Sequence, residues 1–298
     1  MNKSFSMMCA LVTTFIWGTA FIAQDTGMDN IGPLTFNASR FFVGFISILP
    51  VALIFEKKKI FKEISNNKST FYKLLCFMGV SLFFGTFLQQ AALQYTNIAN
   101  AAFFTVFYVP FVPILLFIIY KTKVHWSIWP SILLCIFGVY LLSDFSDSEI
   151  MLGDALVIFC SIFWALHIIF AGKFVEKFDI PIFYAALQAA FVGILSLIFA
   201  YIFEEINLQK ILLESYSIVY AGLLSGGVAF TLQMYAQKNI EEAPAAIIYS
   251  LEGVFAAIAG WIILDQILQI NNVIGCLLIL VAVILSQLTP NVKKFKSK

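Results

Sequence analysis

A carboxylate lies inside an otherwise apolar stretch near the end of the chain. Residues 249–264 read YSLEGVFAAIAGWIIL, and Glu252 is close to the middle of the longer apolar run 243–264, with nine residues before it and twelve after it. Three environments suit such a residue: a protonated carboxyl, a pair with a cation, or contact with water in a central cavity. Each of them keeps Glu252 away from lipid, because a charged group in hydrocarbon is costly. A substrate-binding or proton-carrying role and a purely structural role both stay open.

A single arginine occupies a comparable position in the first half. The chain has 18 Lys and Arg residues, and Arg40 is the one arginine among them. It follows Pro33 by seven residues, which places it about 10 Å into a predicted helix. Its planar guanidinium can bind a carboxylate through two hydrogen bonds, which a lysine cannot do. We expect Arg40 to face the interior of a helix bundle; the alternative is a side chain that extends to the outer interface.

The composition tells which elements must position these groups. The chain is 61% hydrophobic and 12% charged, with a mean hydropathy of +0.93, which indicates an integral membrane protein. Apolar runs near 20 residues are long enough to cross a bilayer as helices. Ten such runs are predicted, at residues 5–23, 33–55, 73–95, 99–120, 126–142, 152–172, 181–202, 215–237, 243–264 and 271–289. The predicted fold is therefore an all-α integral membrane protein with ten transmembrane helices, the first of them retained rather than cleaved as a signal peptide.

The distribution of lysine predicts the orientation. If the N-terminus is inside, 16 lysines fall on the inner side and only Lys210 falls on the outer side. Such an asymmetry is typical of cytoplasmic loops. Both termini are therefore predicted to be cytoplasmic, in a multi-pass protein of the cell inner membrane.

The two halves of the chain resemble each other. At a shift of 144 residues, the segment 88–102 matches the segment 232–246 at six of fifteen positions, and Tyr108 coincides with Glu252. At a shift of 147, Trp17 coincides with Trp164. Chance similarity between apolar helices is the alternative. We predict a first five-helix repeat over 1–143, a second over 152–290 and a basic cytoplasmic tail over 291–298. Because five is odd, the second repeat is inverted, an arrangement common in secondary transporters.

Polar and small side chains gather on single faces of several predicted helices, which suits close packing or the wall of a cavity. The candidate substrate-binding residues are Arg40, Glu252, Trp17, Asn37, Gln89, Tyr108, Trp164, His167, Gln233 and Tyr249. For the two tryptophans and for His167, packing in the core is the alternative. Pro110, Pro113 and Gly253 are candidate hinges, because proline and glycine interrupt or bend helices; static curvature is the alternative.

Several motifs resemble a known family. They are Phe15-Ile-Trp-Gly-Thr-Ala-Phe21, Gly32-Pro-Leu-Thr-Phe-Asn-Ala-Ser-Arg-Phe41, Tyr108-Val-Pro-Phe-Val-Pro113, Ala165-Leu-His-Ile-Ile-Phe-Ala-Gly172 and Ser250-Leu-Glu-Gly-Val-Phe-Ala256. Together they resemble the EamA-type ten-helix permeases of the drug/metabolite transporter superfamily, over nearly the whole chain. The family pattern has a proline where this chain has Gly253. The resemblance implies export of amino acids or related metabolites from a bacterial cytoplasm.

The function that we expect is secondary transport of a small polar metabolite by alternating access. An organophosphate or nucleotide-sugar carrier of the same superfamily is the first alternative, although a single membrane-embedded cation is few for binding phosphate. A non-transport intramembrane protein is the second alternative. An enzyme is not expected, since no HExxH motif, paired aspartates or Ser/His arrangement stands out, and no P-loop indicates ATP-driven pumping. The five cysteines are scattered singly, so neither a disulfide nor a metal site is expected. The expected partners are the substrate, the lipid bilayer and, optionally, protons, with no cofactor and no nucleic acid, in a monomer or homodimer.

Overall fold

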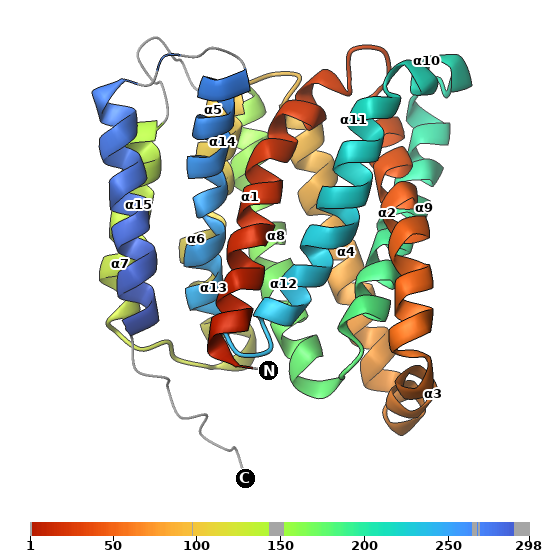
Figure 1. The fold of residues 1–298 in the computed structure, drawn as a ribbon, viewed down its shortest axis with the longest axis horizontal. Helices are drawn as coiled ribbons and strands as arrows, with labels where there is room; N and C mark the ends of the chain where they lie inside the picture. Colours follow the sequence, from red (N-terminus) through yellow and green to blue (C-terminus); the bar gives the residue numbers. More distant parts are fainter. Residues whose placement is uncertain (1, 97, 143–151, 264–266, 268, 289–298) are drawn as a thin grey trace.

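The structure of the protein is a computed structural model that describes residues 2–96, 98–142, 152–263, 267 and 269–288, and every regular element in them is a helix. Most of these helices stand side by side along the height of one bundle (Figure 1). They are α1 (Lys3–Thr26), α2 (Pro33–Phe55), α4 (Lys68–Ala92), α5 (Ile98–Thr105), α6 (Tyr108–Tyr120), α7 (Ile128–Leu142), α8 (Leu152–Lys177), α9 (Pro181–Phe203), α11 (Ser215–Tyr220), η1 (Ala221–Ala229), α12 (Phe230–Ala236), α13 (Glu242–Tyr249), α14 (Leu251–Ile263) and α15 (Ile270–Leu288). Two short helices, α3 (Lys57–Asn66) and α10 (Leu208–Leu213), lie at opposite ends of it.

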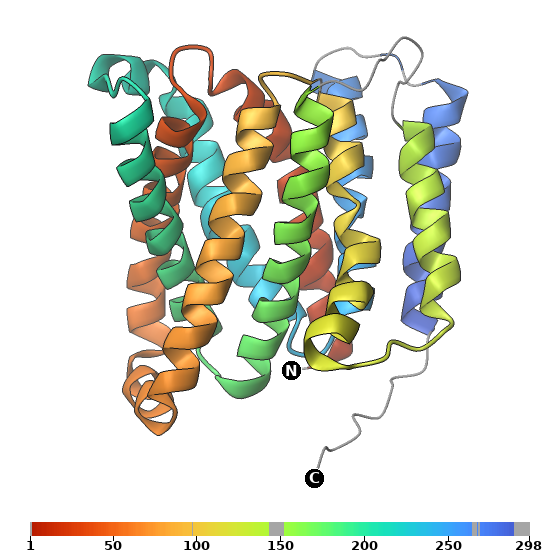
Figure 2. The same ribbon diagram turned by 180° about the vertical axis from the view of Figure 1, so that it is seen from behind.

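The prediction of an all-helical membrane protein is confirmed. Within the described residues, nine helical segments are long and apolar enough to cross a bilayer. The tenth predicted crossing corresponds to α7, an apolar helix of 15 residues that runs beside α15 in both views (Figures 1 and 2). The predicted helix boundaries agree with the observed ones to within five residues. The predicted basic tail, 291–298, lies outside the described residues.

Two glutamates join the ends of α2 and α9, which pack against each other. Both helices begin with a proline, Pro33 and Pro181, whose fixed φ suits the first helical position. Glu204, just after α9, accepts hydrogen bonds from the backbone N–H groups of Leu34 and Thr35, both at 2.8 Å. The N-terminus of α2 is therefore capped by a carboxylate that follows the C-terminus of α9.

The opposite end of the same helix pair shows the reciprocal arrangement. Glu56, just after α2, accepts hydrogen bonds from the backbone N–H groups of Ile182 at 3.1 Å and Phe183 at 2.8 Å. A carboxylate satisfies unpaired N–H groups and opposes the positive end of the helix dipole. Burial raises the pKa of Glu56, although the hydrogen bonds from Phe183 and Ile182 act against that rise.

Two of the crossings are interrupted near their middle. Between α5 and α6, Pro110 lacks the N–H that would bind the carbonyl oxygen of Val106 in a continuous helix, and Val109 N–H binds that oxygen instead, at 2.8 Å. Between α13 and α14, the Ser250 hydroxyl donates to the carbonyl oxygen of Ile247 at 2.6 Å, a bond that bends helices. The interruption between α5 and α6 lies just before Pro110. Gly253 lies one turn beyond the interruption between α13 and α14.

The reciprocal caps generate a stability prediction. Glu204→Ala leaves two N–H groups of α2 without their acceptor, and we expect it to lower the free energy of unfolding by about 1–3 kcal/mol. Thermal unfolding of the purified protein measures the change. Glu205→Ala is the matched control, because Glu205 is an exposed neighbour. Equal melting temperatures for the two variants would contradict the capping role of Glu204.

Glycine positions in α1 and α14 generate a second prediction. A Cβ atom at Gly18 would lie 2.6 Å from the backbone oxygen of Glu252, whereas one at Gly253 would meet only Leu142, at 3.9 Å. We expect Gly18→Ala to force α1 and α14 apart at a cost of about 1–3 kcal/mol. Gly253→Ala is expected to be neutral or to stabilise α14 by up to about 1 kcal/mol, since alanine favours helix. Thermal unfolding of both variants tests this, and the ranking fails if Gly253→Ala is the less stable one.

Candidate functional site

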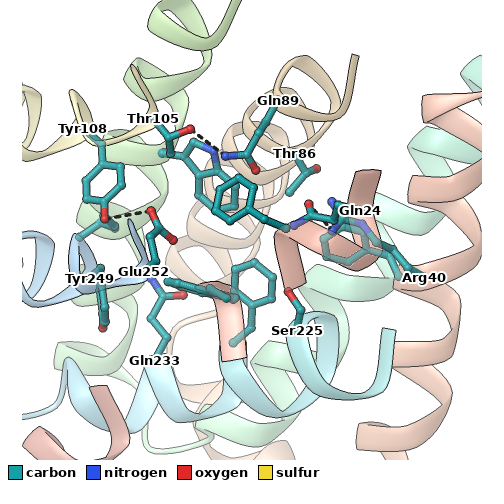
Figure 3. A pocket seen from close by; sticks show the side chains of 16 residues that line it. Gln24, Arg40, Thr86, Gln89, Thr105, Tyr108, Ser225, Gln233, Tyr249 and Glu252 are labelled. Carbon is teal, nitrogen blue, oxygen red and sulfur yellow. Dashed lines mark hydrogen bonds between the residues drawn. The ribbon is translucent and has the colours of Figure 1, made fainter. Parts of the chain in front are cut away.

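A buried cavity lies between the crossings. It is lined by Trp17, Phe21, Gln24, Arg40, Phe41, Thr86, Gln89, Thr105, Tyr108, Trp164, Ile168, Ser225, Phe230, Gln233, Tyr249 and Glu252 (Figure 3). These side chains come from both halves of the chain. The centres of water molecules can occupy about 30 Å³ of it, which is room for roughly two waters at 10–15 Å³ each. The cavity is therefore nearly closed in this conformation.

One end of the cavity holds Arg40, whose exposed fraction is 3%. Its Nη1 donates to Gln24 Oε1 at 2.7 Å and its Nε donates to Asn37 Oδ1 at 2.9 Å. The guanidinium also lies over the rings of Phe36 and Phe41, with its carbon 5.6 and 5.1 Å from their centroids. Both polar partners are neutral. Within the described part of the chain, no carboxylate lies within 4 Å of the guanidinium.

Neighbouring side chains hold the partners of Arg40 in place. Asn37 donates through Nδ2 to Thr86 Oγ1 at 3.0 Å. Gln90 donates through Nε2 to the backbone oxygen of Gln24 at 2.6 Å. Gln89, one residue earlier, donates to Thr105 Oγ1 at 2.8 Å. Residues of α4 thus bind the side chain of Asn37 and the backbone of Gln24, the two residues that solvate Arg40.

Glu252 lies at the other end, with an exposed fraction of 6%. Tyr108 donates through its hydroxyl to Glu252 Oε1 at 3.3 Å (Figure 3). The two residues lie in the first turns of α6 and α14, just beyond the interruptions of their crossings. The interruptions therefore bring the paired groups of two broken helices together, 144 residues apart in the chain.

Aromatic rings line the cavity as well. The Trp17 ring lies 5.2 Å from that of Phe230 and 5.5 Å from that of Tyr249. Trp164 stacks on Phe230 with their ring centroids 6.4 Å apart. Such rings offer flat apolar walls and can also face a cation.

Several buried polar atoms that face this region have no hydrogen-bond partner among the described residues. They are both amide atoms of Gln233, the hydroxyl of Tyr249 and the indole N–H of Trp164. Buried polar groups in proteins are nearly always paired. Of these groups, the amide of Gln233 lies beside Glu252 at one end of the cavity (Figure 3), which suits a polar group of an organic ligand. In the described part of the chain, no group of three or more His, Cys, Asp or Glu side chains could hold a metal ion.

Eight of the ten predicted candidate residues lie on the cavity wall: Arg40, Glu252, Trp17, Gln89, Tyr108, Trp164, Gln233 and Tyr249. Asn37 stands behind the wall as a partner of Arg40. His167 is fully buried, binds Gln188 Oε1 through Nε2 at 3.0 Å and packs against Phe230. Arg40 and Glu252 do not pair with each other: Figure 3 shows them at opposite ends of the cavity.

Sequence reasoning did not select Thr105, Ser225 or Phe230 as candidates. The repeat offered one signal for Thr105. It coincides with the candidate Tyr249 at a shift of 144 residues, as the candidate Gln89 coincides with the candidate Gln233. Ser225 reaches the wall because it lies in η1, a π-helix, and π-helical turns often occur at functional sites. Nothing in the local sequence around Phe230 separates it from lipid-facing phenylalanines.

Ion pairs link the two halves at the end of the bundle where α3 lies. Asp179 contacts both Lys59 and Lys238. The hydrogen bonds from Lys238 and Lys59 hold the pKa of Asp179 below its usual value. Because Asp179 and Lys59 are more than half exposed, these pairs contribute little stability. They connect α3 to the segments that precede α9 and α13.

Comparisons with known proteins agree with this architecture. The model of the EamA-like transporter family matches residues 4–144 and 151–288. A relative from Archaeoglobus fulgidus, named "Uncharacterized transporter", is 31% identical over 93% of this chain and 84% of its own length. A relative from Bacillus subtilis, named "Uncharacterized transporter YoaV", is 23% identical over 95% of this chain and 97% of its own. A solved crystal structure shares the fold, with a TM-score of 0.76, 14% identity and coverage of 96% and 98% of the two chains.

Proposed function

The chain belongs to the EamA-like transporter family, and we propose that it exports small polar metabolites, such as amino acids or related compounds, by alternating access. The observation that carries the proposal is the buried cavity, to which both halves contribute. In it, a cation that has no carboxylate partner among the described residues lies apart from a carboxyl group. Buried ionisable groups in a membrane bundle commonly mark a transport path. The names of the relatives point to transport rather than to catalysis.

Correspondences between the halves support a pair of inverted repeats. The capping glutamates Glu56 and Glu204 are 148 residues apart, and so are the prolines that begin α2 and α9. Tyr108 and Glu252 are 144 residues apart, and each follows an interruption of its crossing. In Figure 1 the chain begins at one face of the bundle, and α8, the first helix of the second half, begins near the other. Two similar units of opposite direction can exchange conformations around a central site.

The nearly closed cavity suits an occluded state of such a cycle. With room for roughly two waters, it must widen before a metabolite enters. The interruption before Pro110, the proline within α6 at Pro113, and Gly253 near the start of α14 are the proposed hinges. Motion at these points would move the upper and lower parts of the broken helices separately, while the Glu56 and Glu204 caps keep α2 and α9 together.

The lysine distribution supports a location in the bacterial inner membrane with both termini in the cytoplasm. On that assignment, Arg40 lies towards the outer face and the Asp179 ion pairs lie at the cytoplasmic face. Among the described residues on the cavity wall, Arg40 is the one cationic side chain, which favours a carboxylate over the higher charge of a phosphate ester.

Export is tested by the extracellular metabolite profile of cells that express the wild type, Arg40→Ala or no transporter. We expect one compound to rise outside wild-type cells, and we expect Arg40→Ala to reduce that export by about tenfold or more, because a charge-assisted bond of roughly 1.5–3 kcal/mol is lost. Lys210→Ala, which removes an exposed cation, is the matched control, with membrane expression equalised. Equal export by wild type and Arg40→Ala would remove Arg40 from the path.

Glu252 is tested by the pH dependence of flux. Glu252→Gln keeps the shape and the Tyr108 contact of the side chain but cannot bind or release a proton. We expect normal expression together with a changed rate or a flattened pH profile of transport in proteoliposomes. A variant that keeps both the rate and the pH profile of the wild type would exclude Glu252 from the mechanism.

A further inference from the structure

The proposed transport cavity has two chemically different ends, and their separation limits what can fill both. Figure 3 shows Arg40 and Gln24 at one end, and Glu252, Tyr108, Tyr249 and Gln233 at the other. Resting on the proposed function, we propose that the substrate is an elongated zwitterion: a carboxylate and an ammonium group at the two ends of a short apolar spacer.

Among the described residues, no anion pairs with Arg40 at its end of the cavity. A buried charge normally has an opposite charge as its partner, since an isolated charge away from water is costly. Arg40 is 3% exposed and is solvated by the neutral amides of Gln24 and Asn37. The carboxylate of a ligand completes this environment, because a guanidinium binds a carboxylate through parallel hydrogen bonds.

The Glu252 end has acceptor atoms that can receive further hydrogen bonds. The carboxyl group receives one long hydrogen bond, from Tyr108 at 3.3 Å. Gln233 is fully buried on the cavity wall, and neither its amide oxygen nor its amide nitrogen has a partner among the described residues. The hydroxyl of Tyr249 is likewise unpaired among them. An ammonium group donates three hydrogen bonds, which the oxygens of Glu252 and Gln233 can accept.

The two ends lie against different turns of α1. Gln24 binds Arg40, whereas α1 packs against the backbone of Glu252 at Gly18, six residues earlier. Six residues of helix correspond to about 9 Å. The α-ammonium and α-carboxylate of an α-amino acid are attached to one carbon atom, so these two groups cannot reach both ends at once. A longer spacer would lie between them, against the rings of Trp17, Phe230 and Trp164.

A graded ligand series tests this length requirement. The purified full chain in detergent is heated with glycine, β-alanine, γ-aminobutyrate, δ-aminovalerate or ε-aminocaproate, and with valerate and pentylamine, which carry one charged end each. A ligand that binds the folded state raises the melting temperature. We expect the shift to grow along the series and to be larger for δ-aminovalerate than for either single-ended compound. An equal shift with glycine, an equal shift with valerate, or no shift with any zwitterion would overturn the inference.

Variants assign the two ends separately. Arg40→Gln is expected to weaken binding of δ-aminovalerate and of valerate, whereas Gln233→Leu is expected to weaken binding of δ-aminovalerate about tenfold to a hundredfold and to spare valerate. Gln209→Leu, in exposed α10, is the matched control. If Gln233→Leu weakens valerate equally, Gln233 does not read the ammonium group and the inference fails.

The experiments can refute the proposed transport and the proposed ligand class independently of each other. Arg40-dependent export of a compound that is not an elongated zwitterion would overturn the inference and leave the proposed function intact. δ-Aminovalerate could instead bind, with the expected effects of Arg40→Gln and Gln233→Leu, but show no flux into proteoliposomes. That result would support the ligand class and contradict the proposed transport function.

Discussion

The arrangement of this protein follows from the need to satisfy polar groups where there is no water. In the hydrocarbon of a bilayer, each backbone group must bind within its own helix, and each charged side chain must face the interior. Arg40 and Glu252 meet that requirement in different ways: the arginine is solvated by amides and aromatic rings, and the glutamate by a tyrosine hydroxyl. The helices that carry them are turned so that these groups share one cavity, while phenylalanine and isoleucine cover much of the outside.

The departures from regular helix gather around that cavity. The crossing of α5 and α6 is interrupted just before Tyr108, the crossing of α13 and α14 just before Glu252, and η1 carries Ser225 to the wall. Irregular backbone is tolerated at membrane depth only where protein or a cavity satisfies the freed groups. The hydrogen bond between Tyr108 and Glu252 lies where the two interruptions meet. Regular helices, by contrast, meet at small residues such as Gly138 and Gly275, where an added Cβ would lie within 3 Å of the facing backbone oxygen.

The two halves are similar in where their helices begin and how they are capped, and different in the polar side chains that they place in the interior. Prolines begin α2 and α9, and reciprocal glutamate caps close both ends of that pair. The position 148 residues after Arg40 is Gln188, which binds His167 rather than an amide of α1. A charged environment in one half thus corresponds to a neutral one in the other. The two halves have similar helices but different polar side chains, so the two ends of the cavity differ. A ligand that binds both ends therefore needs a defined orientation.

The sequence alone determined the membrane class, the helical fold and most helix boundaries, because these depend on local apolar length and on proline positions. It also marked Arg40 and Glu252, since charges in apolar runs stand out without any knowledge of neighbours. Only the tertiary structure decided that these two groups lie apart, that Tyr108 is the partner of Glu252 and that His167 lies behind the wall. It also decided that Phe21, Phe41 and Phe230, among 33 phenylalanines, line the cavity. Those outcomes depend on the rotation and packing of helices distant in the chain, and a periodic apolar pattern carries little information about either.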